Sequence, residues 1–191
     1  MKYLIVYAHP NPNSFNSAEL QTLGSALKQG GHDVRVRDLY AEKFNPVLGP
    51  SDFQALASGS FPADIAAEQS HIRWADVLVF LYPVWWAGMP AMMKGYVDRV
   101  FLKGFAYDYG RDGSIVPLLS GKKAAVFSTT GTPSEFYEKS GMHKSMRQTA
   151  DEGIFAFCGV EVLRHDFFGG IPSSTAEQRA AMLKRLASGL A

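Results

Sequence analysis

Short apolar runs alternate along the chain with segments in which apolar residues recur at helical spacing. The first run, over residues 3–7, is rich in β-forming residues. It is apolar on both faces of a strand, which is typical of a strand covered on both sides. We expect strands over residues 3–7, 34–36, 77–81, 123–128 and 160–168.

Helix signals follow the first of these runs. Asn16, with Glu19 three residues later, predicts a capping box at the start of the first helix. Leu20, Leu23 and Leu27 then form the apolar stripe of that helix. The strand, this helix and the next strand together have the length of a right-handed βαβ crossover.

Later helices are predicted by the same signals. Pro90 suits the first position of a helix with a broad apolar face. Ser174 followed by Glu177 predicts a capping box for the last helix. The stripe of that helix is formed by Leu183, Leu186 and Leu190. Further helices are expected over residues 65–74 and 144–157.

The alternation of five strands with helices predicts a three-layer α/β/α, doubly wound domain with a five-stranded parallel sheet. The chain has 191 residues, which suits a single domain over residues 1–191. Residues 39–64 carry several prolines and glycines and are expected to be irregular. A loop of that length is usually functional or lies at an interface.

The composition excludes several classes of protein and several kinds of site. Apolar residues make up 47% and charged residues 19%, which excludes wholesale disorder. The net charge of +1 offers no bulk attraction for nucleic acid or anionic lipid. Cys158 is the single cysteine, which excludes an intramolecular disulfide and a multi-cysteine metal site. The five histidines are scattered, so we expect no metal.

One stretch requires a membrane check. Residues 77–93 hold no charged residue over 17 positions, which is the lower limit for a spanning helix. Pro83, Gly88 and Pro90 interrupt the stretch, so we expect a strand, a loop and a new helix instead. The apolar run before His9 is too short for a signal peptide. We therefore expect a cytoplasmic protein with no integral membrane segment.

The loop after the first strand is the first candidate for chemistry, because ligands bind beyond the carboxyl ends of strands in such sheets. Residues 9–17 are polar, contain two prolines and run into a helix N-terminus, which suits a phosphate. A plain capping loop is the alternative. The absence of G-x-G-x-x-G disfavours a Rossmann dinucleotide fold, and the absence of G-x-x-x-x-G-K-[ST] excludes a P-loop kinase.

Two further loops end at the same edge of the predicted sheet. Trp85 and Trp86 would face a planar ring, or would belong to the core or to a dimer interface. The small residues at 129–132 would let backbone N–H groups approach a ligand, or would form an ordinary turn. Tyr137 and His143 can donate hydrogen bonds to a developing anion, although such a pair can also be incidental.

Five segments carry a resemblance to a known family. They are Tyr7-Ala8-His9-Pro10 with Ser14-Phe15-Asn16, Pro83-Val84-Trp85-Trp86 through Gly88-Met89-Pro90-Ala91, Lys94-Gly95 with Arg99-Val100-Phe101, Phe105-Ala106-Tyr107-Asp108-Tyr109, and Thr129-Thr130-Gly131. Together they resemble the flavin-dependent NAD(P)H:quinone oxidoreductases, the DT-diaphorase-like members of the flavodoxin-like fold. The resemblance covers nearly the whole chain.

Three positions depart from the family pattern. Trp85 stands where members commonly have Gln, Ala87 where a bulky aromatic residue often follows, and Thr132 where the last glycine of Thr-Thr-Gly-Gly falls. The chain is also too short for the C-terminal extension of the larger animal enzymes. These departures leave the expected fold and flavin site in place and leave the substrate preference open.

The resemblance implies a bound flavin, with FAD expected and FMN as the alternative. It implies two successive two-electron steps in one site, in which NAD(P)H gives a hydride to the flavin and a quinone then receives it. Tyr137 and His143 are the implied catalytic residues, which stabilise negative charge on the reduced ring and supply protons.

The resemblance also assigns binding roles. The implied flavin-binding residues are His9, Ser14, Phe15, Asn16, Pro83, Val84, Trp85, Trp86, Ala87, Thr129, Thr130, Gly131, Thr132, Tyr137 and Arg179. The implied substrate-binding residues are Tyr107, Asp108, Tyr109, Trp86 and His143. Tyr107 and Tyr109 would reach across the interface of a homodimer. Residues 39–64 and 101–109 also supply more apolar surface than a monomer readily hides.

Two other functions remain open. A flavodoxin-like electron carrier needs an acidic docking face, and the net charge of +1 argues against it. Some relatives are cytoplasmic ancillary proteins of glutathione-gated potassium efflux systems and also reduce quinones. The sequence leaves that role, and a peripheral association with a transporter, open.

Overall fold

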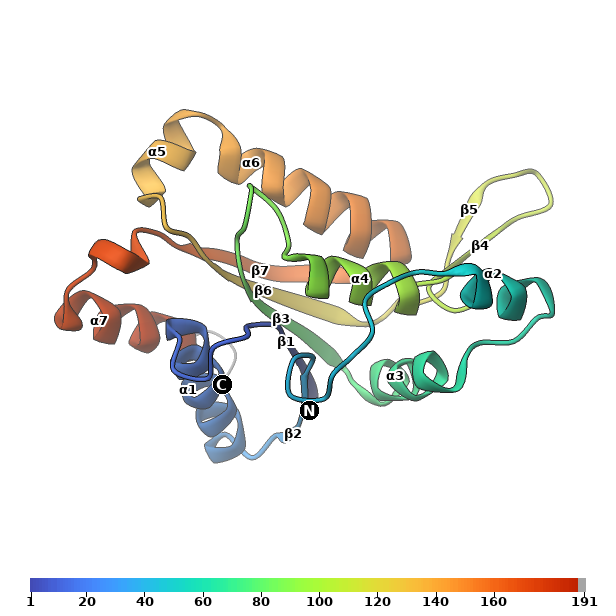
Figure 1. Cartoon of the computed structure of the whole chain (residues 1–191), viewed down its shortest axis with the longest axis horizontal. Helices are drawn as coiled ribbons and strands as arrows, with labels where there is room; N and C mark the ends of the chain where they lie inside the picture. Colours follow the sequence, from blue (N-terminus) through green and yellow to red (C-terminus); the bar gives the residue numbers. More distant parts are fainter. Residues whose placement is uncertain (189–191) are drawn as a thin grey trace.

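The computed structural model describes residues 1–188, which form an open sheet of five strands between two layers of helices (Figure 1). The strands of this sheet are β1 (Lys2–Tyr7), β2 (Asp33–Asp38), β3 (Val77–Pro83), β6 (Lys123–Thr129) and β7 (Glu161–Phe168). Their order is β2-β1-β3-β6-β7, and all neighbours are parallel. The predicted fold class is confirmed, and the strand order reverses direction between β1 and β3.

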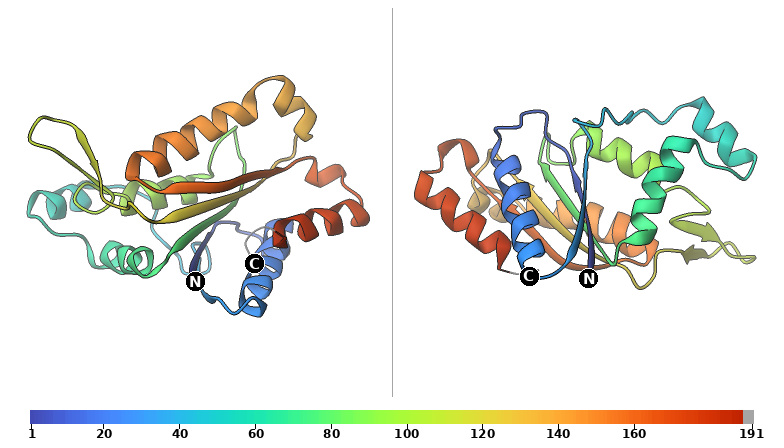
Figure 2. Two further views of the ribbon diagram at one scale, coloured as in Figure 1. Left: turned by 180° about the vertical axis from the view of Figure 1, so that it is seen from behind. Right: turned by 90° about the horizontal axis from the view of Figure 1, so that it is seen from below.

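Helices cover both faces of the sheet (Figure 2). One layer consists of α1 (Phe15–Gln29) and α7 (Ala176–Ala187). The other consists of α3 (Ala63–Trp74), α4 (Ala91–Val100) and α6 (Met142–Arg147), which continues as a π-helical segment (Gln148–Phe155) and a 3₁₀ turn (Ala156–Cys158). The smaller elements are α2 (Pro50–Ala57), α5 (Ser134–Lys139), a 3₁₀ turn (Ile171–Ser173) and the antiparallel hairpin of β4 (Tyr107–Tyr109) and β5 (Ile115–Pro117).

Each face of the sheet has its own hydrophobic core. On β3, Phe80 is buried under α3, α4 and the π-helical segment, whereas Val79 and Leu81 are buried under α1 and α7. Successive strand residues point to opposite faces, so a strand covered on both sides must be apolar throughout. This explains why β3 reads as an uninterrupted apolar run and not as an alternating one.

The predicted cap of the first helix is wrong. Ser14 has extended backbone angles and its Oγ accepts the N–H of Ser17, so α1 begins at Phe15. Asn16 lies inside the helix, where its Nδ2 donates to Oε2 of Glu19 at 3.0 Å. Asn16 and Glu19 do interact at the predicted spacing of three residues. The helix is nevertheless capped by the hydroxyl of Ser14, which accepts the free N–H group that the side chain of Asn16 was expected to bind.

The capping box of the last helix is also shifted by one residue. Thr175 is the N-cap of α7, and it exchanges hydrogen bonds with Gln178. Ser174 instead donates to the carbonyl oxygen of Ile171. Leu186 is buried as expected, while Leu190 lies outside the described residues. Pro90 is likewise the N-cap of α4 and not its first helical residue.

Two predicted segments differ in detail. Residues 144–157 are not one α-helix, because α6 gives way to the π-helical segment after Arg147, and the short helix α5 precedes it. Residues 39–64 are not wholly irregular, because they contain α2. The local pattern of residues 50–57 is too short for periodicity to distinguish a two-turn helix from a loop.

The segment between β2 and α3 is fastened to α4 by a buried arginine. Arg99 binds Oδ1 of Asp52 and Oδ2 of Asp64, both at 2.7 Å, and donates to the carbonyl oxygen of Asn45. A Cβ at Gly95 would lie 2.2 Å from the carbonyl oxygen of Pro46. Only glycine at this position lets the Pro46 backbone approach α4 so closely.

Candidate active site

A cavity of about 720 Å³ opens at the carboxyl edge of the sheet, where the strand order reverses. Its volume is in the range of small-molecule sites. Eleven of the residues predicted to hold a flavin line it, namely His9, Ser14, Phe15, Asn16, Pro83, Val84, Trp85, Trp86, Thr129, Gly131 and Arg179. The structure therefore brings together three loops and the last helix, which are far apart in the sequence.

The loop after β1 forms the first wall. The backbone N–H of Asn11 donates to Nδ1 of His9 at 3.0 Å, and that of Asn13 donates to Oδ1 of Asn11 at 2.9 Å. Burial lowers the pKa of His9, so its imidazole is neutral at pH 7. These bonds fix a polar loop that leads into the N-terminus of α1, where the helix dipole favours a phosphate.

Arg179, on α7, lies at one side of the large cavity. Its Nε donates to Oγ of Ser174 at 2.9 Å, and its Nη2 donates to the carbonyl oxygen of Ile171 at 3.2 Å. The guanidinium is thus held in place at the rim of the cavity. A fixed cation here can pair with the phosphates or the polar end of a nucleotide.

A strained turn forms the second wall. The backbones of Trp85 and Gly88 exchange two hydrogen bonds at 3.1 and 3.2 Å. The two residues between them, Trp86 and Ala87, have φ angles of 51° and 58°. This is the geometry of a type I′ turn, which non-glycine residues adopt at a cost. The turn leaves the indole of Trp86 fully exposed at the cavity.

A buried carboxyl group lies beneath the third wall. Thr129, at the end of β6, donates to Oδ1 of Asn16 at 2.8 Å, and Asn16 donates to Glu19. Glu19 is completely buried, and this burial raises the pKa of its carboxyl group well above the usual range. The carboxyl therefore keeps its proton to a higher pH than an exposed glutamate does, and it lies under two cavity-lining residues. The sequence placed Glu19 in a cap and missed this role.

The two predicted catalytic residues lie side by side on neighbouring helices. The rings of Tyr137 on α5 and His143 on α6 are perpendicular, with centroids 5.7 Å apart. His143 is buried, and its Nε2 has no hydrogen-bond partner within residues 1–188. Burial lowers the pKa of His143, the exposed Glu138 opposes this shift, and Arg147 adds to it. The imidazole is therefore neutral at pH 7.

The remaining predicted residues do not line the large cavity. Thr130 and Thr132 stiffen the loop after β6, because Oγ1 of Thr130 donates to the carbonyl oxygen of Thr132 at 2.6 Å. Ala87 lines a separate cavity behind the turn. Tyr137 and His143 lie beyond the same loop on α5 and α6.

Three of the five predicted substrate-binding residues lie elsewhere in the chain. Tyr107, Asp108 and Tyr109 form β4, and Figure 1 shows this hairpin at the opposite end of the molecule from α5. One chain therefore does not bring them to the cavity. The ring of Phe157 packs on that of Tyr107, with centroids 5.1 Å apart. Sequence analysis did not single out Phe157.

Two residues after the fifth strand also belong to the cavity, although they were not predicted from the sequence. Ile171 and Pro172 line the cavity and follow β7 almost directly. The rule that ligands bind beyond the carboxyl ends of strands applies to this loop as well. The signal was therefore present, although the loop carries no phosphate motif.

The cavity fits a flavin mononucleotide moiety by its donor set. It offers exposed indole surface for a flat ring, hydroxyl and amide groups at the N-terminus of α1 for a phosphate, and the Arg179 guanidinium at its rim. Within residues 1–188, no group of three or more His, Cys, Asp or Glu side chains could hold a metal ion. No helix in that range is long and apolar enough to cross a bilayer.

Fold and cavity together define a flavodoxin-like protein with a nucleotide-sized site at the switch point of its sheet. The family model described as "Flavodoxin-like fold" matches residues 1–190. A Haemophilus influenzae protein described as an uncharacterized NAD(P)H oxidoreductase is 37% identical over 96% of this chain and 91% of its own. The NAD(P)H dehydrogenase [quinone] 1 of Cavia porcellus is 34% identical over 94% and 72%.

Solved structures give the same result. A putative quinone reductase from Klebsiella pneumoniae matches with a TM-score of 0.90 and 33% identity over 98% of this chain and 82% of its own. The NAD(P)H:quinone oxidoreductase of Methanothermobacter marburgensis matches with a TM-score of 0.87 and 30% identity over 98% and 95%. The chain therefore belongs to the flavodoxin-like NAD(P)H:quinone oxidoreductase family. The predicted resemblance and the assignment to the oxidoreductases are confirmed.

Proposed function

We propose that the protein is a flavin-dependent NAD(P)H dehydrogenase that passes two electrons to quinones. The single observation that carries the proposal is the cavity at the switch point, which gathers eleven of the predicted flavin-binding residues. A homologue 34% identical to this chain is named an NAD(P)H dehydrogenase [quinone], which supports the same activity.

The walls of the cavity have separate roles in binding. The N-terminus of α1, with Ser14 and Asn16, would hold the phosphate of the flavin. The Trp85–Gly88 turn and the loop at Thr129 and Gly131 would hold the ring from two sides. When bound, a flavin supplies hydride chemistry between a nicotinamide and a quinone.

Tyr137 and His143 would act on the charge that develops in the reaction. A buried, neutral imidazole with an unpartnered Nε2 can donate a hydrogen bond to a developing anion, and the phenol of Tyr137 can do the same. Their hydrogen bonds strengthen as negative charge builds, so they stabilise the transition state more than the ground state. Both can then supply a proton to the reduced acceptor.

The substrate-binding residues require a second chain. Because Tyr107, Asp108 and Tyr109 lie far from the cavity of their own chain, we propose a twofold homodimer in which they cover the partner's cavity. Exposed apolar residues near this hairpin support the arrangement, namely Phe53, Tyr109, Ile115, Val116, Leu118 and Phe157. Light scattering at micromolar concentration checks it, and the mass of a single chain would contradict it.

FAD is the proposed cofactor, with FMN as the alternative. Arg179 supports FAD, because it lies at the rim of the cavity, where the adenine end of a dinucleotide would leave it. Heat releases a non-covalent flavin, and chromatography separates FAD from FMN. We expect one FAD per chain in the wild type and a lower FAD content in Arg179→Ala. A preparation that holds no flavin after reconstitution with either cofactor would overturn the proposed function.

A further inference from the structure

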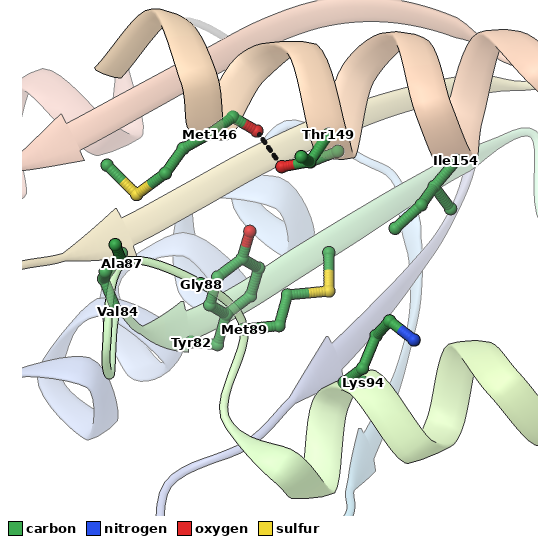
Figure 3. Close-up of a pocket in the computed structure, with 10 residues that line it drawn as sticks. Tyr82, Val84, Ala87, Gly88, Met89, Lys94, Met146, Thr149 and Ile154 are labelled. Carbon is green, nitrogen blue, oxygen red and sulfur yellow. Dashed lines mark hydrogen bonds between the residues drawn. The ribbon is translucent and has the colours of Figure 1, made fainter. Parts of the chain in front are cut away.

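A second cavity, of about 310 Å³, lies behind the Trp85–Gly88 turn (Figure 3). It is enclosed by the turn, by β3 and the start of α4, and by α6 with its π-helical continuation. Its lining is mainly apolar, with contributions from Val84, Ala87, Met89, Met146, Ala150 and Ile154. Val84 also lines the large cavity, so the two cavities adjoin at one side chain.

The polar groups at this second cavity are already satisfied or uncharged. Lys94 pairs with Oδ1 of Asp98 at 2.6 Å, and Oγ1 of Thr149 donates to the carbonyl oxygen of Met146 at 3.0 Å. Burial raises the pKa of Tyr82 to about 12, so its phenol stays neutral. An ordered water would need several free polar partners, whereas an apolar group needs none. The second cavity therefore suits an uncharged, apolar guest.

Small side chains keep this cavity open. Figure 3 shows Ala87 at the tip of the turn, facing the helix that carries Met146 and Thr149, and Ala150 follows on that helix. Protein interiors are normally close-packed, so an open apolar space next to a ligand site indicates room for part of a ligand. Its volume is at the lower end for ligand pockets, which fits a substituent and not a whole substrate.

We propose that the second cavity receives an aliphatic side chain of the electron acceptor, so that alkyl-substituted quinones are preferred over unsubstituted ones. This rests on the proposed function, because the quinone ring must lie in the large cavity for its substituent to pass Val84. Burying each methylene is worth about fourfold in affinity. The preference for an alkyl-substituted quinone over an unsubstituted one then increases with the length of the alkyl chain until the chain fills the second cavity.

The test uses the flavin-loaded enzyme and para-benzoquinones with alkyl chains from methyl to octyl. In the wild type, we expect KM to fall about fourfold for each added methylene over the first members, with kcat little changed. Ala150→Leu fills the second cavity and should abolish this dependence. Gln148→Leu places the same side chain at an exposed neighbouring position and should leave the dependence intact. Ile154→Ala should extend the dependence to longer chains.

Binding of para-hexylphenol, followed by calorimetry, gives a readout that needs no turnover. We expect binding to the wild type and to Gln148→Leu, and at least a tenfold loss in Ala150→Leu. If hexylphenol binds in this pattern while no quinone is reduced, the apolar site stands and the proposed function fails. If quinones are reduced at rates independent of chain length in every variant, the proposed function stands and the inference is overturned. Dissociation of a dimer in Ala150→Leu, without any chain-length dependence, would show that a second copy fills the cavity and would also overturn it.

Discussion

The imidazole of His143 lies flat on the ring of Phe167, with centroids 4.2 Å apart and planes 9° apart. His165 also stacks on Phe167, with centroids 4.4 Å apart, and its Nδ1 lies 2.7 Å from Oδ1 of Asp151. His143 thus packs directly on Phe167 of β7, which in turn packs on His165 of β7, and His165 pairs with Asp151 of the π-helical segment. None of these three was identified from the sequence as part of the site.

Removing this stacking should misplace His143 without removing it. Phe167→Leu keeps an apolar residue in β7 but takes away the flat surface. We expect the flavin to remain bound and its reduction by NAD(P)H to slow by about 10- to 100-fold, since small misplacements of a catalytic group have effects of this size. Leu163→Ala, at an exposed position on the same strand, is the control and should keep the wild-type rate. An unchanged rate in Phe167→Leu would show that the stack has no part in catalysis.

The catalytic assignment itself predicts the behaviour of His143→Ala and Tyr137→Phe. Both variants should still bind flavin, because the hydrogen bonds of these residues strengthen only as charge builds on the reduced ring. Loss of one hydrogen-bond donor to a developing anion costs roughly 1–4 kcal/mol, or about 10- to 1000-fold in rate. Stopped-flow bleaching of the flavin by NAD(P)H measures this rate. If both variants are reduced as fast as the wild type, the assignment is wrong even though the family is right.

The lowered pKa of His143 predicts how flavin reduction depends on pH. The imidazole is neutral at pH 7, and it gains its charge only as the pH falls through its lowered pKa. Because a cation stabilises a developing anion better, the reduction rate should rise over that range. Glu138 opposes the lowering, so Glu138→Gln should move the rise to a still lower pH. Glu135→Gln, on the same helix, should leave the profile unchanged, and a shift of equal size there would contradict this account.

The buried Glu19 predicts a pH effect on stability. Its pKa is raised in the folded state, so the folded protein keeps a proton that the unfolded chain releases near pH 4.5. The free energy of unfolding should therefore fall as the pH rises from about 4.5 towards the folded-state pKa of Glu19. Urea unfolding between pH 5 and pH 8 should show this slope in the wild type and a reduced slope in Glu19→Gln. The exposed Glu161→Gln serves as control, and equal slopes in all three proteins would exclude the effect.

Much of the fold was predictable because it depends on local patterns. The five predicted strands match the observed ones within two residues at each end. β3 is buried on both faces and leaves an unambiguous apolar signal, whereas the largely exposed β2 was predicted from two valines alone. The helix caps were less predictable. Ser14 and Thr175 each compete with a neighbour of similar chemistry, and the sequence alone does not show which hydroxyl meets the free N–H group first.

The walls of the site were predictable because they follow the strands in the chain. Trp85 and Ser14 lie in loops, and Thr129 lies at the end of β6, so the order of the sheet fixes the position of all three. The supporting residues were not predictable from spacing. The stack under His143 and the burial of Glu19 arise from contacts between elements distant in the sequence, and no local periodicity encodes them.

Anaerobic stopped-flow spectroscopy of the purified protein follows both halves of the proposed reaction in one experiment. The flavin absorbance is followed while NAD(P)H is added, and an alkyl-substituted para-benzoquinone is then mixed with the reduced protein. We expect the flavin absorbance to bleach fully with one equivalent of NAD(P)H and to return fully with one equivalent of quinone, without a one-electron intermediate. A flavin that stays oxidised with NAD(P)H, or a reduced flavin that quinones do not reoxidise, would contradict it.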